Sequence, residues 1–165
     1  MVVIGVRSSR VSGETILIVG SGDGATAAGA ILDGAPYRVL RAADGLRALE
    51  ALGTKPAQLV VADWAMPGLD GMGLRRAVRD RPGIAAPQFI LVREPLADAQ
   101  RVVEALEAGV ESLTVPFEPA ELLARVRAEL REVALRADQT RLQALVATSP
   151  VRSTAARTTP TTPWR

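Results

Sequence analysis

Two stretches of the sequence carry residues whose types and spacing could do chemistry. Residues 16–27, ILIVGSGDGATA, run from an apolar segment into three alternating glycines between Gly20 and Gly24. Residues 60–71, VVADWAMPGLDG, place Asp63 at the end of a second apolar segment. A glycine loop between a strand and a helix can hold a phosphate group. An acid at the end of a parallel strand points its side chain into the ligand crevice of the sheet.

The composition excludes several kinds of site. The 165 residues include no cysteine and no histidine, which removes disulfides, thiol catalysis, zinc–thiolate sites and the commonest general base. Hydrophobic residues make up 48% of the chain and aromatic residues only 3%, so the core is expected to consist of Val, Leu, Ile and Ala. The formal charge of +2 does not indicate a nucleic-acid partner. Because no segment approaches the roughly 20 apolar residues of a membrane helix, we expect a soluble, cytoplasmic protein.

Strand-like and helix-like segments alternate along the chain and must position these residues. Strands are expected at 14–20, 37–42, 58–63, 89–92 and 112–115, and helices at 25–32, 45–52, 72–79, 97–108 and from Pro119 onward. Five such units predict a doubly wound α/β fold, with one five-stranded parallel sheet covered by helices on both faces. Ligands then bind beyond the carboxyl ends of the strands. The loops expected there are 20–23, 63–70, 92–94 and 115–117.

The last helix is longer than a helix that only covers a sheet. Apolar or small residues recur in it at alternating spacings of three and four, namely Leu123, Val126, Leu130, Val133, Ala137, Thr140 and Ala144. This spacing predicts a seam that dimerises or binds a partner helix, and the alternative is an amphipathic helix folded on its own domain. The predicted divisions are a flexible N-terminal extension (1–13), a globular domain (14–130), an extension of the last helix (131–147) and a disordered tail (148–165).

The stretch around Asp63 resembles the receiver domain of two-component response regulators. In that family an Asp at this strand end is the phosphoacceptor, and the surrounding pattern D-x-x-M-P-x-x-D-G is present at residues 63–71. A second similarity is the closing PFEPAEL of residues 116–122. The resemblance covers residues 14–130 and implies a flavodoxin-like sheet of strand order 2-1-3-4-5. It also implies a role in signal transduction by a two-component phosphorelay.

Other positions of the receiver site differ from the family pattern. The resemblance places the family's acidic metal-binding pair at Gly20 and Ser21, its hydroxyl at Val92, its lysine at Val115 and its switch aromatic near Leu113. None of these residues has the family's chemistry. A single carboxylate is a poor Mg²⁺ site, so we expect no metal and no other cofactor. Asp23 as a metal ligand and Arg93 as a cation are the residues that could rebuild the site.

These departures predict an atypical receiver, a pseudo-receiver that is not an enzyme and acts by protein–protein interaction. The expected partner is a histidine kinase or an output protein, bound through the fourth helix, fifth strand and last helix, and no nucleic-acid or membrane partner is expected. One alternative is a working receiver that uses Mg²⁺ and is phosphorylated on Asp63. The other is a Rossmann-like protein that binds a nucleotide or dinucleotide through Gly20, Gly22 and Gly24, although Arg41 stands where a ribose-binding acid is expected.

Overall fold

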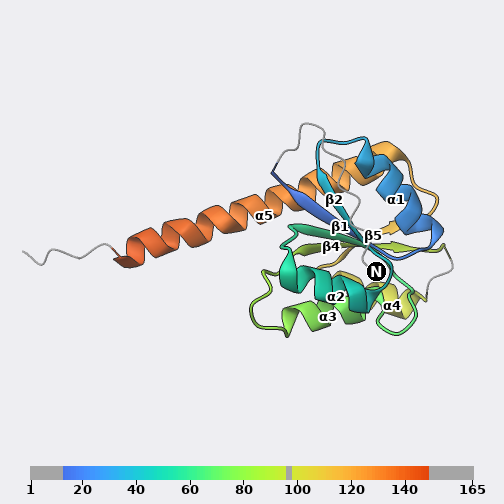
Figure 1. Ribbon diagram of the computed structural model, residues 1–165, viewed down its shortest axis with the longest axis horizontal. Coiled ribbons are helices and arrows are strands. Elements are labelled where there is room, and N and C mark those ends of the chain that lie inside the picture. The colour runs from blue at the N-terminus through green and yellow to red at the C-terminus, as the bar shows by residue number, and fades with distance from the viewer. Residues whose placement is uncertain (1–12, 96–97, 149–165) are drawn as a thin grey trace, which may run out of the picture.

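The computed structural model describes residues 13–95 and 98–148 (Figure 1). Strands and helices alternate through this part of the chain. The strands are β1 (Thr15–Val19), β2 (Arg38–Ala42), β3 (Leu59–Asp63), β4 (Gln88–Arg93) and β5 (Glu111–Thr114). The helices are α1 (Asp23–Asp33), α2 (Gly45–Thr54), α3 (Gly71–Arg79), α4 (Ala99–Glu107) and α5 (Pro119–Thr148).

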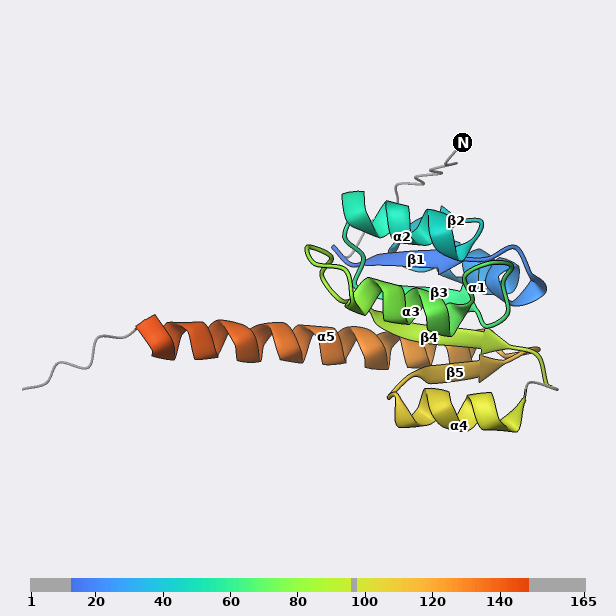
Figure 2. The same cartoon turned by 90° about the horizontal axis from the view of Figure 1, so that it is seen from below.

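The five strands form one parallel sheet in the order β2-β1-β3-β4-β5 (Figure 2). This result confirms the predicted fold class, strand order and long last helix. β3 lies in the centre, with β1 on one side and β4 on the other. The register pairs Asp63 at the end of β3 with Val92 of β4. Since all strands are parallel, the residues that follow β1, β3 and β4 meet at the same edge of the sheet.

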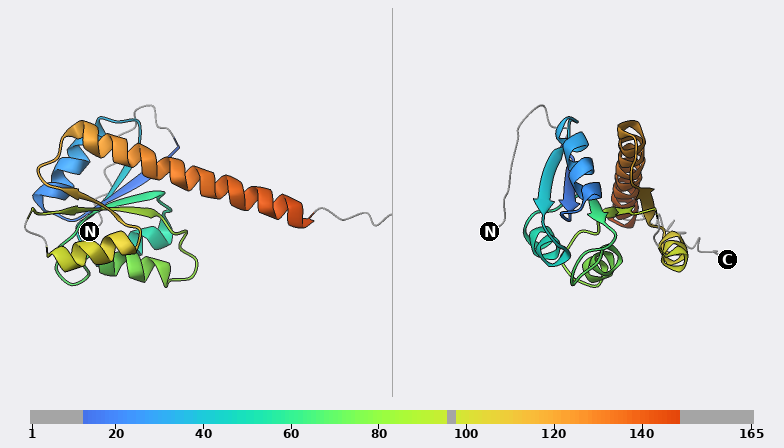
Figure 3. Two further views of the ribbon diagram at one scale, coloured as in Figure 1. Left: turned by 180° about the vertical axis from the view of Figure 1, so that it is seen from behind. Right: turned by 90° about the vertical axis from the view of Figure 1, so that its right-hand side faces the viewer.

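Two apolar layers enclose the sheet, and successive residues of each strand alternate between them. On one face, Ile18 and Val61 pack with Leu122 and Val126 of α5 and with residues of α1. The other face packs against α2, α3 and α4, with Leu74 of α3 among its fully buried residues. Figure 3 shows α1 and α5 on one side of the sheet and α2, α3 and α4 on the other.

Several predicted boundaries were wrong by a few residues. α2 continues past Gly53 to Thr54, because a glycine weakens a helix by about 1 kcal/mol without ending it. α1 begins at Asp23 instead of residue 25, and α4 spans Ala99–Glu107. β5 ends at Thr114, so Val115 follows the strand instead of closing it.

α5 leaves the globular part of the molecule and continues as a single projecting helix (Figure 1). Its buried residues are Leu122, Val126 and Leu130, and from Arg131 onward every residue through Thr148 is exposed except the half-buried Val133. The predicted seam therefore needs a correction, because its first half covers the chain's own sheet.

The predicted flexible extension and disordered tail lie outside the described residues, apart from Gly13 and Thr148, and Thr148 belongs to α5. Within the described ranges, none of the helices is long and apolar enough to cross a membrane.

The two halves of α5 should respond differently to the same substitution. Leu122→Ala is expected to lower the free energy of unfolding by about 2–5 kcal/mol, because Leu122 is completely buried and the variant leaves a cavity. Leu135→Ala is the matched control, since Leu135 is 60% exposed on the same helix, and its effect should stay within about 0.5 kcal/mol. Urea unfolding of dilute protein measures both values. Equal losses in the two variants would contradict the described packing of α5.

Candidate functional site

Asp63 ends the central strand and is one of two buried polar residues in the described part of the chain. The residues before it in β3, Leu59 to Ala62, are completely buried and apolar. Because these residues are apolar, β3 is buried in the centre of the sheet. Asp63 then places one carboxylate at the carboxyl end of the strand. Only 9% of Asp63 remains exposed. A buried carboxylate needs hydrogen-bond partners, because losing water without replacing its hydrogen bonds is costly.

The start of α1 supplies those partners. The backbone N–H of Gly22 donates to Oδ2 of Asp63 at 2.9 Å, and the N–H of Ala25 donates to Oδ1 at 2.9 Å. The first N–H groups of a helix have no partner within the helix, and Gly22 at the N-cap position provides no side-chain acceptor. The Asp63 carboxylate therefore caps α1 from a different element and lies at the positive end of its helix dipole.

Two opposing effects act on the ionisation of Asp63. Burial raises the pKa of its carboxyl group above the ordinary value, and the nearby charge of Asp23 raises it further. The hydrogen bonds from Gly22 and Ala25 lower the pKa, because they favour the ionised form. The net shift is upward.

Gly20 makes this arrangement of Asp63 sterically feasible. A Cβ atom at position 20 would lie 2.2 Å from Oδ2 of Asp63, much closer than two such atoms can approach. The residue also has a φ angle of 119°, which glycine adopts more readily than other residues. The carboxylate of Asp63 thus occupies the space that a side chain at position 20 would need.

A cavity of about 460 Å³ adjoins this carboxylate at the carboxyl end of the sheet. The predicted site residues that line it are Ser21, Gly22, Asp23, Gly24, Asp63, Val92 and Arg93. Val92 also packs against the start of α1, where a Cβ on Gly24 would lie 2.4 Å from its Cγ1 atom. The structure therefore brings together residues at the carboxyl ends of β1, β3 and β4, with an apolar side chain at the predicted hydroxyl position.

The two substitutes named from the sequence, Arg93 and Asp23, line the same cavity as Asp63. Arg93 lines the cavity, but no ion pair joins it to Asp63 within the described ranges, and its buried Nε atom has no hydrogen-bond partner there. Asp23 is the first residue of α1 and lies near enough to disfavour the charge on Asp63. Among the residues that the structure describes, no group of three or more Asp, Glu, His or Cys side chains is arranged to hold a metal.

Two of the predicted positions lie away from this cavity. Leu113 is buried in the apolar layer shared with α5. Val115 lines a second cavity of about 350 Å³ with Asp23, Glu94 and Phe117. The residues of the predicted interaction helix line neither cavity.

Sequence reasoning missed other residues in or near the cavity beside Asp63. Asp70 caps α3, where its Oδ1 accepts a hydrogen bond of 2.7 Å from the N–H of Gly73, and it forms an ion pair with Arg101 of α4. The buried Trp64 and the exposed Arg101 both line the cavity. An Asp directly before a helical segment is a recognisable N-cap signal, whereas no local pattern links Arg101 to residue 70.

The family model for the response regulator receiver domain matches residues 23–127. The chain belongs to the response regulator receiver family. The resemblance found at residues 63–71 and 116–122 is thereby confirmed, and signal transduction in two-component systems is the receiver family's function.

Curated relatives of this receiver include longer regulators. The transcriptional regulatory protein CseB of Streptomyces avermitilis is 38% identical over 96 residues, which cover 58% of this chain and 39% of that protein. The DNA-binding response regulator MtrA of Mycolicibacterium paratuberculosis is 34% identical over 102 residues, which cover 61% of this chain and 44% of that protein. The chain thus spans less than half the length of these relatives.

Solved structures show the same fold. A CheY-like response regulator receiver domain protein from Methanospirillum hungatei is 28% identical with a TM-score of 0.64, and the match covers 76% of this chain and 99% of that one. An adenylate cyclase from Rhodopirellula baltica has a TM-score of 0.69 at 19% identity, with 83% of this chain and 99% of that chain covered. At this identity the second likeness concerns the fold alone.

The contact between Asp63 and Gly20 can be measured with a double-mutant cycle. Gly20→Ala should lower the free energy of unfolding by at least about 2 kcal/mol, because it combines backbone strain with overpacking against the carboxylate. Gly68→Ala is the matched control for strain, since Gly68 has a φ angle of 78° and open space around it; its expected cost is about 1–2 kcal/mol.

In an Asp63→Ala background, the cost of Gly20→Ala should fall toward that of Gly68→Ala, because the clashing carboxylate is gone. Urea unfolding of the four proteins of the cycle gives the coupling. A cost of Gly20→Ala that is the same in both backgrounds would mean that the Asp63 carboxylate does not lie against residue 20.

Proposed function

We propose that this receiver is a non-enzymatic signalling module that acts by protein–protein interaction and whose state does not depend on phosphorylation of Asp63. The observation that carries the proposal is the engagement of both carboxylate oxygens of Asp63 by the amides of Gly22 and Ala25. A phosphoacceptor carboxylate must direct a lone pair at phosphorus. Each oxygen of Asp63 keeps one lone pair besides the one that accepts its capping hydrogen bond, but the two bonds orient the carboxylate toward α1 and lower the nucleophilicity of both oxygens.

The surroundings of Asp63 also offer little help to phosphoryl transfer. Catalysis of this step depends on neutralising charge at the transferred phosphoryl group. The family uses a metal-binding acidic pair, a hydroxyl and a lysine for this purpose, and the aligned residues here are Gly20, Ser21, Val92 and Val115. Val92 is buried and apolar, and the space around Gly20 is taken by Asp63 itself. These features support a receiver held in one state, with no bound Mg²⁺.

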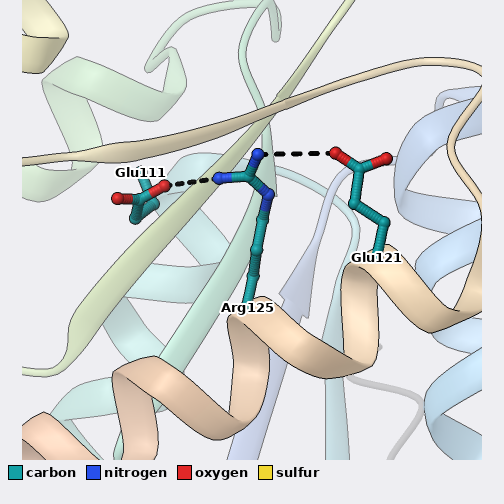
Figure 4. A network of polar contacts seen from close by, with 3 residues as sticks. All are labelled: Glu111, Glu121 and Arg125. Atoms are coloured by element: carbon teal, nitrogen blue, oxygen red, sulfur yellow. Dashed lines mark hydrogen bonds and ion pairs between the residues drawn. The ribbon is translucent and has the colours of Figure 1, made fainter.

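The surface formed by α4, β5 and α5 is our candidate for partner binding. α4 leaves Val103 and Leu106 46% and 61% exposed, although both are large apolar residues. Nearby, Arg125 of α5 donates to Glu111 of β5 at 2.6 Å and to Glu121 at 3.4 Å (Figure 4). This partly exposed network fixes α5 against β5 and gives the surface a polar border. Such a surface suits another signalling protein, a histidine kinase or an output protein, as the partner.

The dinucleotide alternative is disfavoured by the same hydrogen bonds. A pyrophosphate bound to a glycine loop would accept hydrogen bonds from the backbone N–H groups at the start of the helix. Here the N–H groups of Gly22 and Ala25 already donate to Asp63. The expected absence of a nucleic-acid partner has no support from the relatives, one of which is named a DNA-binding response regulator. It stays a prediction, as does the cytoplasmic location.

The proposal predicts that phosphoryl analogues leave the protein unchanged. Addition of Mg²⁺ with beryllofluoride should produce no chemical-shift changes around Asp63 in the ¹H–¹⁵N NMR spectrum, and incubation with a small phosphodonor should add no phosphate to the intact mass. The Asp63→Asn variant gives the baseline for both measurements. A receiver with a complete acidic pair, treated in the same way, shows that the reagents are active.

A phosphate adduct that disappears in Asp63→Asn would overturn the proposal. The chain would then be a phosphorylation switch, and substitution of Asp23 and Arg93 would test whether they rebuild the site. Shifts confined to residues far from Asp63 would indicate non-specific binding of the ions and leave the predicted result intact.

A further inference from the structure

Arg93, the last residue of β4, has a guanidinium group without a partner in the described part of the chain. The group carries five N–H donors, and within residues 13–95 and 98–148 it takes part in no ion pair. Its Nε atom is buried and has no hydrogen-bond acceptor there. A buried donor without an acceptor lowers stability, so such an atom in a folded protein calls for an explanation.

The cavity of about 460 Å³ that Arg93 lines has an acidic side, formed by Asp23, Asp63 and Glu94. None of these three carboxylates forms an ion pair within the described ranges. The charge of Asp23 raises the pKa of Asp63, so these two groups lie close enough to repel each other. The acidic side therefore gains from any positive charge that enters the cavity.

The two other charged residues of the cavity lining are already engaged. Asp98 caps α4, where it accepts a hydrogen bond of 2.9 Å from the N–H of Gln100. Arg101 forms its ion pair with Asp70. The unpaired charges of the cavity are thus the three carboxylates of the acidic side and the single guanidinium of Arg93.

These unpaired charges face the cavity from opposite sides of the sheet. Asp63 points toward α1, where it meets the amides of Gly22 and Ala25. Arg93 follows Leu91 by two residues, and Leu91 belongs to the apolar layer on the other face. Since successive side chains of a strand alternate between the two faces, Arg93 leaves the strand toward the layer that includes α4. Figure 3 shows α1 and α4 on opposite sides of the sheet.

Glu94 lies on the same side as Asp23. Both line the second cavity of about 350 Å³, together with Ala27 of α1. Glu94 is exposed, as Asp23 is. The acidic side therefore lies next to α1, across the end of the sheet from the guanidinium.

This separation of charge disfavours a ligand of one sign. An anion that pairs with Arg93 is repelled by three carboxylates, and a simple cation at the acidic side leaves Arg93 without an acceptor. A molecule with an ammonium group at one end and a carboxylate at the other satisfies both sides. A carboxylate also matches the fork of a guanidinium with two parallel hydrogen bonds.

The dimensions of the cavity fit such a molecule. Sites for small ligands have volumes of roughly 300–1,000 Å³ and a partly apolar lining, and here Met66 and Val92 supply apolar surface for a carbon chain. The two charged groups of the ligand must be several carbon atoms apart, because their partners lie on opposite sides of the sheet. An α-amino acid carries both groups on one carbon atom and does not meet this requirement.

We propose that the cavity beside Asp63 binds a small ω-amino carboxylic acid, with its ammonium group at the acidic side and its carboxylate at Arg93. This inference deepens the proposed function, on which it rests, by naming an input for a receiver that phosphorylation does not switch. The ligand lies beside Asp98 at the start of α4, and α4 carries part of the candidate partner-binding surface. Ligand binding therefore acts next to that surface.

The test is a titration of the full chain with 6-aminohexanoate, followed by ¹H–¹⁵N NMR without Mg²⁺ or a phosphodonor. We expect saturable shifts of the amide signals of Gly22, Ala25 and Arg93, with a dissociation constant of roughly 1 mM. Three analogues each lack one feature. Hexanoate has no ammonium group, hexylamine has no carboxylate, and 2-aminohexanoate has the same atoms with both charges on one carbon. Each should bind at least about tenfold more weakly.

Variants assign the two ends of the ligand. Arg93→Gln should remove the advantage of 6-aminohexanoate over hexylamine, because the partner of the carboxylate is gone. Asp23→Asn should weaken the binding of 6-aminohexanoate and leave that of hexanoate no weaker. Arg76→Gln is the matched control, since Arg76 is exposed on α3 and lines neither cavity, and it should bind as the wild type does. The spectra without ligand show whether each variant folds.

Several results would overturn the proposal. They are the absence of saturable shifts with 6-aminohexanoate, equal binding of any of the three analogues, and an Arg93→Gln variant that binds as the wild type does. The proposed function fails on a different result, a phosphate adduct on Asp63, which these titrations cannot produce because they contain no phosphodonor. The two proposals therefore fail separately.

Discussion

The hydrogen bonds between the Asp63 carboxylate and the first turn of α1 are the interaction on which the site depends. They join the central strand to a helix that has no cap of its own, and they hold a carboxylate that is almost fully buried. Gly20 provides the space for this approach, and Val92 packs tightly against the same helix start. The glycine loop that looks like a phosphate cradle is therefore occupied by a side chain of the protein itself.

This constraint gives a physical reason why a chain can keep the receiver fold without the phosphorylation that usually switches a receiver. The parallel sheet and both helical layers are complete without any charge at positions 20, 92 or 115. The family's phosphorylation chemistry, in contrast, needs a free carboxylate and several charged or hydroxyl groups near it. A chain that keeps the receiver fold but lacks these charged and hydroxyl groups suits regulation by association. This is the mode of action that we propose for the surface of α4, β5 and α5.

Much of the fold could be predicted from the sequence because periodicity and strand ends are local signals. The D-x-x-M-P-x-x-D-G pattern placed Asp63 at the end of the central strand. The hydrogen bonds from Gly22 and Ala25 to Asp63 have no local signal in the sequence, because these backbone amides are 41 and 38 residues away from it. The first half of the seam predicted on α5 belongs to the chain's own core, and the sequence did not show this for a related reason. Spacings of three and four identify an apolar stripe without saying whether the chain's own sheet covers it, and Val126 and Leu130 turned out to be core residues.

The most direct measurement of the central claim is amide hydrogen exchange at Gly22 and Ala25, followed by NMR in the wild type and in Asp63→Ala. If the carboxylate caps α1, both amides are protected in the wild type and exchange faster in the variant. The amide of Gly73, which donates to Asp70 in the equivalent turn of α3, should exchange at the same rate in both proteins. Unchanged exchange at Gly22 and Ala25 in the variant would contradict the account, because it would show that Asp63 is not their acceptor.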